Sequence, residues 1–369
     1  MSWSVRVAGV QYESWTSLKF SRSIKDNTGR FGFETTDKSP GLQPIRANEV
    51  VTIFYKSTLV FTGHLDVLNF KGSRSGSSIG YSGRGVMSDL ADSSLHDSAK
   101  SIKGSSVTIK STASLILNAL GVAGYQVVDK TKDAIGDKKV KLQKVGSSGA
   151  SAMQFLAKLA AANQVWLVEN EAGNLEIIRA GEVVSDFKFY YLIKGDGLNN
   201  ILDADLKIDL ANSFYKIKVR GKGSIAYNVS NQADSDVVDI FGENIDDWSR
   251  KTRYLEIKNT DIKTASAAKS RALDEVNLRR AKALEYRILT NSFVDKSGKI
   301  LRIGDLIFVE DEQRSMFGKF VVASFDVSFD RATGTQVNIL LAPAEAYQIV
   351  DIDERESKVK KTSSLIKKG

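Results

Sequence analysis

Residues 49–65 read Glu49-Val-Val-Thr-Ile-Phe-Tyr55, then Lys-Ser-Thr58, then Leu59-Val-Phe-Thr-Gly63-His-Leu65. Two runs of β-branched and aromatic residues around a short polar turn predict a β-hairpin. Further short strand patterns fill residues 3–85, with Gly and Ser between them and little helical periodicity. This succession predicts an antiparallel sandwich or barrel.

A similar pattern recurs near the other end of the chain. Residues 305–341 again place an acid before a strand, then a turn, a glycine inside a long strand, and a further strand after a flexible loop. Residue identity between the two stretches is low, so chance similarity of two β units is one interpretation. The other is duplication, which predicts two related barrels with Gly63 and Gly318 at equivalent positions.

The stretch between these β units has a different residue pattern, with helix signals as well as strand signals. We expect helices over 112–120 and from Ser151, where Ser151 and Gln154 fit a capping box. Strand patterns at 165–168 and 175–178 predict a hairpin. Lysines outnumber aspartates between 97 and 144, which indicates a solvated or docking surface. Together these features predict a small α+β unit.

One long helix is expected over 262–286, with Asp261 as its cap. Its apolar stripe is small, so it should pack closely on a sheet; the stripe consists of Ala265, Ala268, Ala272 and Val276. The predicted fold is mainly β with an α+β insertion: two related antiparallel, tube-like β-barrel domains, a small α+β domain and the long helix. Strands within 182–220 are also candidates to complete the first barrel. The expected domains are 1–96 (first barrel), 97–181 (α+β insertion), 182–350 (second barrel with the long helix) and 351–369 (charged tail).

Composition excludes several classes of site. The 369 residues carry a formal charge of +8, modest for a polyanion-binding protein of this length. With no cysteine, the chain has no disulfide, thiolate metal site or cysteine nucleophile, and two histidines cannot form a multi-histidine metal site. Neither a secretory signal nor a membrane-length apolar run is visible, so we expect synthesis as a soluble chain in a host cytoplasm, without membrane insertion.

The sequence offers no convincing catalytic constellation. It has no Gly-x-Ser-x-Gly turn, and His64 with Asp66 is more consistent with a structural strand histidine than with a catalytic dyad. His96 lies in a polar stretch and is expected to be inert. Carboxylates two apart or adjacent are expected by chance among 44 acids; they are Asp203 with Asp205, Asp246 with Asp247, and Asp351 with Asp353 and Glu354. We therefore predict no catalytic, cofactor-binding or metal-binding residues and no enzymatic activity.

With these features together, the sequence resembles the Mu-type baseplate hub proteins of contractile phage tails, which are related to the hub part of type VI secretion spike proteins. The resemblance rests on the order and spacing of several pieces. They are residues 15–24; Val60-Phe-Thr-Gly-His-Leu-Asp66 with Tyr81-Ser-Gly-Arg84 and Asp89-Leu90; 271–280; Leu301-Arg-Ile-Gly-Asp305; and Phe329-Asp330 with Gly334 and Leu340-Leu-Ala-Pro-Ala-Glu-Ala-Tyr347.

The resemblance implies a structural role in a virion. Each chain of such a hub carries two tube-like barrels, and three chains form a homotrimeric ring between a hexameric tail tube and a trimeric spike, with a central channel for genome passage. Implied partners are the tail tube or a tube-initiator protein, the central spike and other baseplate proteins, with DNA only in transit. We expect Ile352, Val359, Leu365 and Ile366 of the tail to dock on a neighbouring chain.

Two other functions remain open from the sequence. One is a tail-associated cell-wall hydrolase, which an assay of peptidoglycan clearing would reveal. The other is a nucleic-acid-binding module, which would bind DNA with a steep salt dependence. The lysines of 100–144 have only Tyr125 as an interleaved aromatic, so a stacking surface for single strands lacks support.

Overall fold

The structure of the chain is a computed structural model. It describes residues 3–12, 15–36, 45–73, 76–95, 107–122, 124–140, 150–163, 165–194, 197–220, 238–239, 249–258, 265–344 and 347. The chain divides into two compact units. The main unit consists of Met1–Ala204 and Arg287–Leu341, and the smaller unit of Asp205–Tyr286 and Ala342–Gly369.

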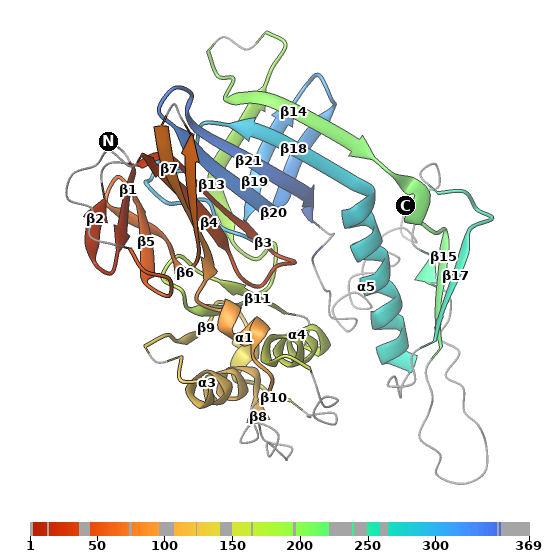
Figure 1. Cartoon of the computed structure of the whole chain (residues 1–369). Coiled ribbons are helices and arrows are strands. Elements are labelled where there is room, and N and C mark those ends of the chain that lie inside the picture. Colours follow the sequence, from red (N-terminus) through yellow and green to blue (C-terminus); the bar gives the residue numbers. More distant parts are fainter. Residues whose placement is uncertain are drawn as a thin grey trace. The chain divides into compact units, whose positions relative to one another are not determined.

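The N-terminal part of the main unit is built from strands whose apolar residues alternate between the core and solvent, as in Trp3, Val5 and Val7, which are buried. The hairpin predicted over 49–65 is confirmed. The strands, warm-coloured in Figure 1, are β1 (Trp3–Val7), β2 (Val10–Tyr12), β3 (Trp15–Ser23), β4 (Arg30–Thr36), β5 (Val50–Tyr55), β6 (Thr58–Ser73) and β7 (Gly76–Gly85).

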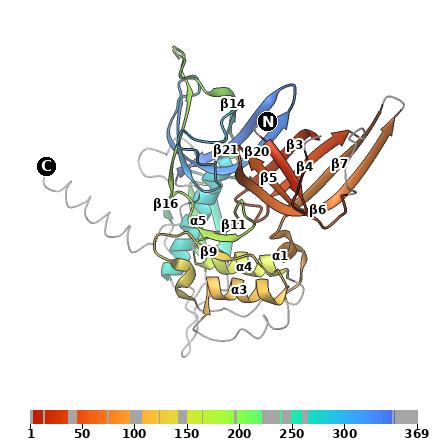
Figure 2. The same cartoon turned by 90° about the vertical axis from the view of Figure 1, so that its left-hand side faces the viewer.

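Strand β6 is much longer than its neighbour β5. Its residues 58–64 pair with β5, whereas residues 67–73 pair with β7 alone among the described strands. A β-bulge between Leu65 and Val67 separates the two halves. In Figure 2 the distal part of the β6–β7 hairpin extends beyond β5.

The α+β insertion follows β7 and packs around its own apolar core, in which Ile116, Leu156 and Ile177 are fully buried. The predicted capping box is confirmed: the Ser151 hydroxyl accepts from the Gln154 N–H, and the Gln154 side chain accepts from the Ser151 N–H. The predicted hairpin is also confirmed, as β11 and β12. The elements are α1 (Ser88–Asp92), β8 (Val107–Thr108), α3 (Ile109–Ala119), β9 (Val127–Asp129), η1 (Ile135–Asp137), β10 (Lys139–Val140), α4 (Ala152–Ala162), β11 (Trp166–Glu169) and β12 (Leu175–Ile178).

The remaining strands continue the large sheet. They are β13 (Val184–Tyr191), β14 (Ile201–Ile208), β18 (Leu284–Thr290), β19 (Leu306–Asp311), β20 (Met316–Asp330) and β21 (Gly334–Pro343). Among the described residues the sheet has 13 strands in the order β14-β18-β21-β20-β3-β4-β7-β6-β5-β1-β2, with β19 paired to β20 and β13 to β19. The fold is therefore mainly β and largely antiparallel, as predicted. The prediction of two separate barrels is not confirmed: β3 pairs directly with β20, so the strands of both predicted barrel regions belong to one hydrogen-bonded sheet.

Strand β20 carries two partners along one edge. Its first half, residues 316–321, pairs with β19, and its second half, residues 324–330, pairs antiparallel with β3. An aromatic cluster fills the core beside the β3–β20 pairing. The ring centroid of Phe293 lies 5.5 Å from that of Phe20 and 5.9 Å from that of Trp3. The Trp3 Nε1–H also donates to Thr335 Oγ1 at 2.9 Å. These contacts join the two ends of the main unit.

The predicted equivalence of Gly63 and Gly318 is wrong. Gly63 pairs with Val51, the second residue of β5, whereas Gly318 pairs with Val309, the fourth residue of β19. The glycines also serve different purposes. A Cβ on Gly63 would lie 2.2 Å from the Arg84 carbonyl oxygen, whereas Gly318 has open space and a φ of +122°.

In its described residues, the smaller unit contains a three-stranded sheet, one α-helix and a short 3-10 helix. Its core consists of Ile217 and Val219 from the sheet and Ala268, Ala272 and Val276 from the helix, so three residues of the predicted small-sided stripe pack on strands. The side chain of the fourth, Ala265, lies outside the described part of the chain. The predicted cap, Asp261, lies outside the described residues. The elements are η2 (Leu210–Asn212), β15 (Lys216–Arg220), β16 (Val238–Asp239), β17 (Tyr254–Lys258) and α5 (Ala265–Ala283).

Candidate functional site

A cluster of buried and half-buried charges lies where β3, the α+β insertion and the segment before β19 meet inside the main unit. We call it the charged junction; it consists of Arg22, Glu169, Glu171, Glu176, Arg302 and Asp305. Five of these residues, all but Glu171, line a cavity of about 110 Å³. Charges are seldom buried unless they are paired, so each needs an explanation.

Arg22 extends from β3 to the end of β11. Its Nη1 donates to the carbonyl oxygen of Glu169 at 3.1 Å and its Nη2 to that of Asn170 at 2.9 Å. Burial lowers the pKa of Arg22, although Glu169, Glu171 and Glu176 act in the opposite direction. The guanidinium thus holds the loop after β11 against the sheet.

The Glu169 side chain links the end of β11 back to the backbone of earlier parts of the chain. Its Oε2 accepts from the Gly29 N–H and its Oε1 from the Met87 N–H, both at 3.1 Å. Burial raises the pKa of the Glu169 carboxyl, and the Arg22 charge and the backbone donors oppose this shift. A Cβ on Gly85 would lie 1.7 Å from Glu169 Oε2, so this carboxylate can approach the backbone only where residue 85 has no side chain.

The segment before β19 completes the junction. Arg302 forms an ion pair with Glu171, whose carbonyl oxygen accepts from Thr62 Oγ1 of β6 at 2.9 Å. Burial raises the pKa of Asp305 to about 7; Glu176 adds to the shift, and Arg302 and Lys299 oppose it. The junction therefore ties three segments of the chain together through charge-assisted hydrogen bonds.

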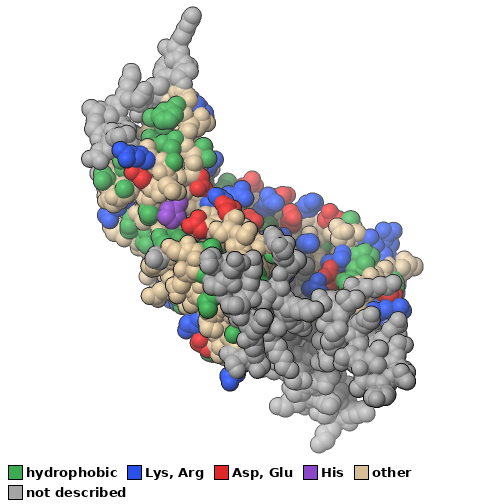
Figure 3. Space-filling view, turned by 60° about the horizontal axis from the view of Figure 1, so that its bottom comes forward, with side chains coloured by type: hydrophobic (Ala, Val, Ile, Leu, Met, Phe, Trp, Pro, Cys, Tyr) green, Lys and Arg blue, Asp and Glu red, His purple; other side chains and the backbone are tan. Residues whose placement is uncertain are grey.

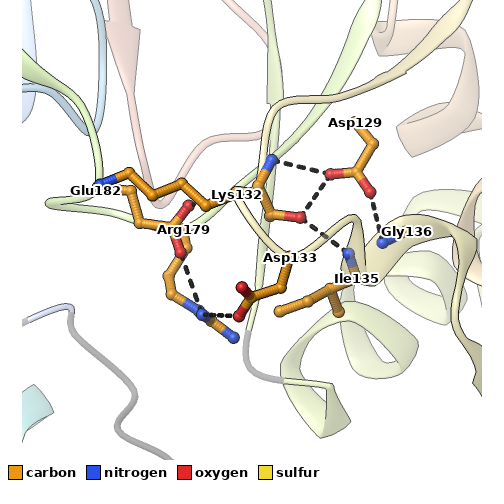
Figure 4. A network of polar contacts seen from close by, with 8 residues as sticks. Asp129, Lys132, Asp133, Ile135, Gly136, Arg179 and Glu182 are labelled. Carbon is orange, nitrogen blue, oxygen red and sulfur yellow. Dashed lines mark hydrogen bonds and ion pairs between the residues drawn. The ribbon is translucent and has the colours of Figure 1, made fainter.

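A second polar network stabilises the α+β insertion itself. The Asp129 carboxylate accepts from the Gly136 N–H at 2.7 Å, and Arg179 bridges Asp133 and Glu182 at 3.4 and 3.0 Å (Figure 4). The Lys132 N–H donates to the Glu182 carboxylate at 3.0 Å. These contacts fix the loop after β9 and satisfy local backbone groups, and Arg179 also lines the cavity of the charged junction.

The weakly supported His64–Asp66 dyad has another explanation. Asp66 sits at the β-bulge of β6, and its carboxylate accepts from Arg84 Nε at 2.9 Å. Arg84 also pairs with Asp92 at 2.7 Å, and the two hydrogen bonds raise its pKa. Asp66 therefore forms an ion pair with Arg84, which also pairs with Asp92, so these contacts link β6, β7 and α1.

The other residues singled out from the sequence separate into two groups. Asp203 and Asp205 lie in β14, where Asp203 Oδ1 accepts from the Ala204 N–H. Outside the described residues lie His96, Asp246, Asp247, Asp351, Asp353, Glu354 and the tail residues Ile352, Val359, Leu365 and Ile366. Across the described ranges, no group of three or more His, Asp or Glu side chains is arranged to hold a metal ion.

One face of the molecule mixes charges of both signs (Figure 3). On the face in Figure 3, Lys and Arg side chains are interspersed with Asp and Glu and with hydrophobic groups. Such a pattern contrasts with the single-sign field that concentrates polyanions. None of the helices in the described part of the chain is both long and apolar enough to span a bilayer.

The charged junction could have been found only in part from the sequence. Arg22, Arg302 and Asp305 lie within the pieces on which the baseplate resemblance rested. Glu169 was missed because it is one ordinary acid after an apolar strand. Its partners are backbone N–H groups at Gly29 and Met87, which carry no side-chain signal.

Comparisons with known proteins agree with the fold. Residues 2–85 match the family model of the N-terminal domain of the GpP-like Mu phage baseplate assembly protein. A sequence comparison with curated proteins finds no match. Among solved structures, the 43 kDa tail protein of prophage MuSo2 from Shewanella oneidensis is 22% identical with a TM-score of 0.75, over 94% of this chain and 99% of that one.

Two further structures are similar. A tail protein from Neisseria meningitidis is 16% identical with a TM-score of 0.76, covering 94% of this chain and 98% of its own. An Escherichia coli protein described as a component of the type VI secretion system is 10% identical with a TM-score of 0.54, covering 92% and 76%. The predicted resemblance is thus confirmed: residues 2–85 match a Mu-type baseplate domain, and the chain as a whole shares its fold with prophage tail proteins.

Proposed function

We propose that the chain is a structural baseplate hub of a contractile tail. In this proposal three copies form a ring that adapts a hexameric tail tube to a trimeric spike and leaves a channel for the genome. The match of residues 2–85 to a baseplate domain and the tail-protein fold of nearly the whole chain support it. Tail tube, spike and other baseplate proteins are its proposed partners, and the virion tail is its location.

The strand order is the observation that carries this proposal. Strands β3, β4, β5, β6 and β7 lie in the spatial order β3-β4-β7-β6-β5. Strands β14, β18, β19, β20 and β21 lie in the corresponding order β14-β18-β21-β20-β19. A duplicated unit is what a threefold ring needs in order to present six similar faces to a hexameric tube. We call these two sets the first and second repeat.

The charged junction suits a structural role. A hub between tube and spike must keep its repeats in a fixed relation, and directional hydrogen bonds to buried charges favour one arrangement over others. Arg22 and Glu169 link the first repeat to the α+β insertion, and Arg302 links the insertion to the second repeat. We further propose that residues 351–369 dock on a neighbouring chain through Ile352, Val359, Leu365 and Ile366.

The decisive experiment is to count copies in assembled particles. Tails assembled with a tagged chain should contain three copies in each baseplate, and averaged images should show a threefold ring between tube and spike. Six copies, one copy, or a location elsewhere in the particle would contradict the proposal. Peptidoglycan clearing by the purified protein would favour a hydrolase instead, and steeply salt-dependent DNA affinity a nucleic-acid-binding module.

A further inference from the structure

The second half of β6 ends in an exposed apolar edge. Phe70 is 72% exposed and Val67 is 52% exposed, and residues 67–73 have β7 as their only partner among the described strands. Leu68 and Phe70 lie opposite Tyr81 and Ile79 of β7. They therefore continue the apolar layer in which Tyr81 is buried. An unpaired apolar edge of this kind is a template for another strand.

The corresponding edge in the second repeat is covered. The hairpins β5–β6 and β19–β20 can be aligned at the pairs farthest from their turns, Val50–His64 and Leu306–Val321. This alignment makes residues 67–73 equivalent to 324–330, the stretch of β20 that pairs with β3. Phe70 then corresponds to Val327, which is 2% exposed because β3 lies beside it.

The equivalent of β3 in the second repeat is β14, the end strand of the sheet, whose only neighbour among the described strands is β18. The buried residues of β3 are Trp15, Leu18 and Phe20, and β14 shows the same spacing in Ile201, Ala204 and the half-buried Leu206. Exposed apolar side chains occur on β14 as well, at Leu202 (56%) and Ile208 (52%).

We propose that β14 of one chain pairs antiparallel with residues 67–73 of β6 in the next copy, reproducing between chains the β3–β20 pairing found within the chain. The inference rests on the proposed ring of identical chains. It completes the coverage of Phe70, and it joins two different edges. Such a head-to-tail contact generates a closed ring when the rotation permits closure.

The register follows from the equivalences. Val327 lies opposite Phe20, so Phe70 lies opposite Leu206; likewise Phe325 opposite Arg22 places Leu68 opposite Ile208. Ser328 opposite Lys19 places Lys71 opposite Asp205. The interface therefore has two apolar cross-strand pairs and one pair of opposite charges, each of a kind that stabilises antiparallel strands.

Disulfide trapping tests this register directly, because the chain has no cysteine of its own. Assembled tails carrying both Phe70→Cys and Leu206→Cys should, after mild oxidation, give covalent multimers that end at the ring's copy number. Each single variant alone should give no covalent dimer. A mixture of the two single variants should give dimers and nothing larger. A control pair, Val10→Cys with Phe317→Cys, is exposed at 48% and 57% and should not cross-link.

A charge swap gives an independent readout in the same assembly. Lys71→Glu and Asp205→Lys should each reduce the yield of assembled tails about tenfold or more, because like charges then oppose each other at every copy of the interface. The double variant should restore assembly to near the original level. Lys319→Glu, an exposed charge reversal on β20, is the matched control and should assemble normally.

The outcomes separate this inference from the proposed function. A three-copy ring that forms no disulfide and tolerates Lys71→Glu would overturn the pairing and leave the hub role standing. Cross-linked rings of another copy number would support the pairing and contradict the trimer. A chain absent from tails, with neither disulfide nor charge effect in the purified protein, would overturn both.

Discussion

At the scale of single residues, the charged junction depends on positions at which one added carbon atom would displace a hydrogen-bonded carboxylate. Glu169 is buried, yet its oxygens each accept from a backbone N–H, and Gly85 leaves the space in which the carboxylate lies. Such a group stabilises the fold only while its hydrogen bonds are intact. Breaking a buried pair leaves the remaining charge without compensation.

Gly85→Ala should therefore destabilise the protein by about 2–3 kcal/mol, because the added Cβ displaces the buried Glu169 carboxylate from its donors. Denaturant unfolding measures the loss. Gly80→Ala in the same strand is the matched control, since its Cβ would meet its nearest neighbour at an ordinary 3.8 Å. Equal stability of the two variants would show that the site around residue 85 relaxes freely.

Asp305 predicts a pH dependence of stability. Its folded-state pKa of about 7 lies above the usual 3.8, so between these values the folded state binds more protons than the unfolded state. The contribution of Asp305 to stability is therefore greatest at low pH and falls as pH rises towards 7. Relative to Asp305→Asn, the native protein should gain stability as the pH falls from 8 to 5. Asp186→Asn, at an exposed position, should show no such trend relative to the native protein.

At the scale of elements, local signals determine helix ends and hairpins better than they determine strand neighbours. The Ser151–Gln154 capping box and the hairpin over 165–178 are visible in the sequence because each depends on residues a few positions apart. The pairing of β3 with β20 joins residues about 300 positions apart, and the sequence of neither strand specifies which strand lies beside it. The misplaced equivalence of Gly63 and Gly318 has the same origin, since matching glycines by eye ignores strand register.

The cap of α4 gives a measurable test at this scale. Ser151→Ala should lower the free energy of unfolding by about 1 kcal/mol, because the Gln154 N–H at the start of α4 loses its acceptor. Lys158→Ala, on the exposed face of the same helix, should change stability little. Two results against this interpretation are possible: no loss at Ser151, or an equal loss at Lys158.

At the scale of the whole molecule, the relation between the repeats follows from how a duplicated sheet uses its edges. Within the chain, β3 of the first repeat covers β20, the long strand of the second repeat. The equivalent contact, between β14 and β6, is the one proposed to form with another copy. A sequence alone reveals the repeated strand patterns but not which edge stays open, because openness depends on pairings across the whole fold. The charged junction is hidden for the same reason: its six residues come from three distant segments.

The proposed tail contact predicts the effect of a truncation. Removing residues 351–369 should leave the main unit folded, with an unchanged unfolding midpoint, and should reduce incorporation into tails. Replacing Ile352, Val359, Leu365 and Ile366 by Ser should have the same effect, because these are the apolar side chains proposed to dock. Normal assembly of either variant would remove the tail from the interface.

The link between Trp3 and Thr335, 332 residues apart, bears on how the protein reaches its native state. Strand β3 emerges from the ribosome long before β20, its neighbour, has been translated. During that interval Phe20 and the edge of β3 are not yet paired with β20, so the nascent chain exposes an apolar strand edge that is prone to aggregation. Contacts of such sequence separation also slow folding. Slowing translation late in the chain should therefore lengthen the interval in which chaperones bind it, and a host with depleted chaperones should accumulate the protein as aggregate rather than as tails.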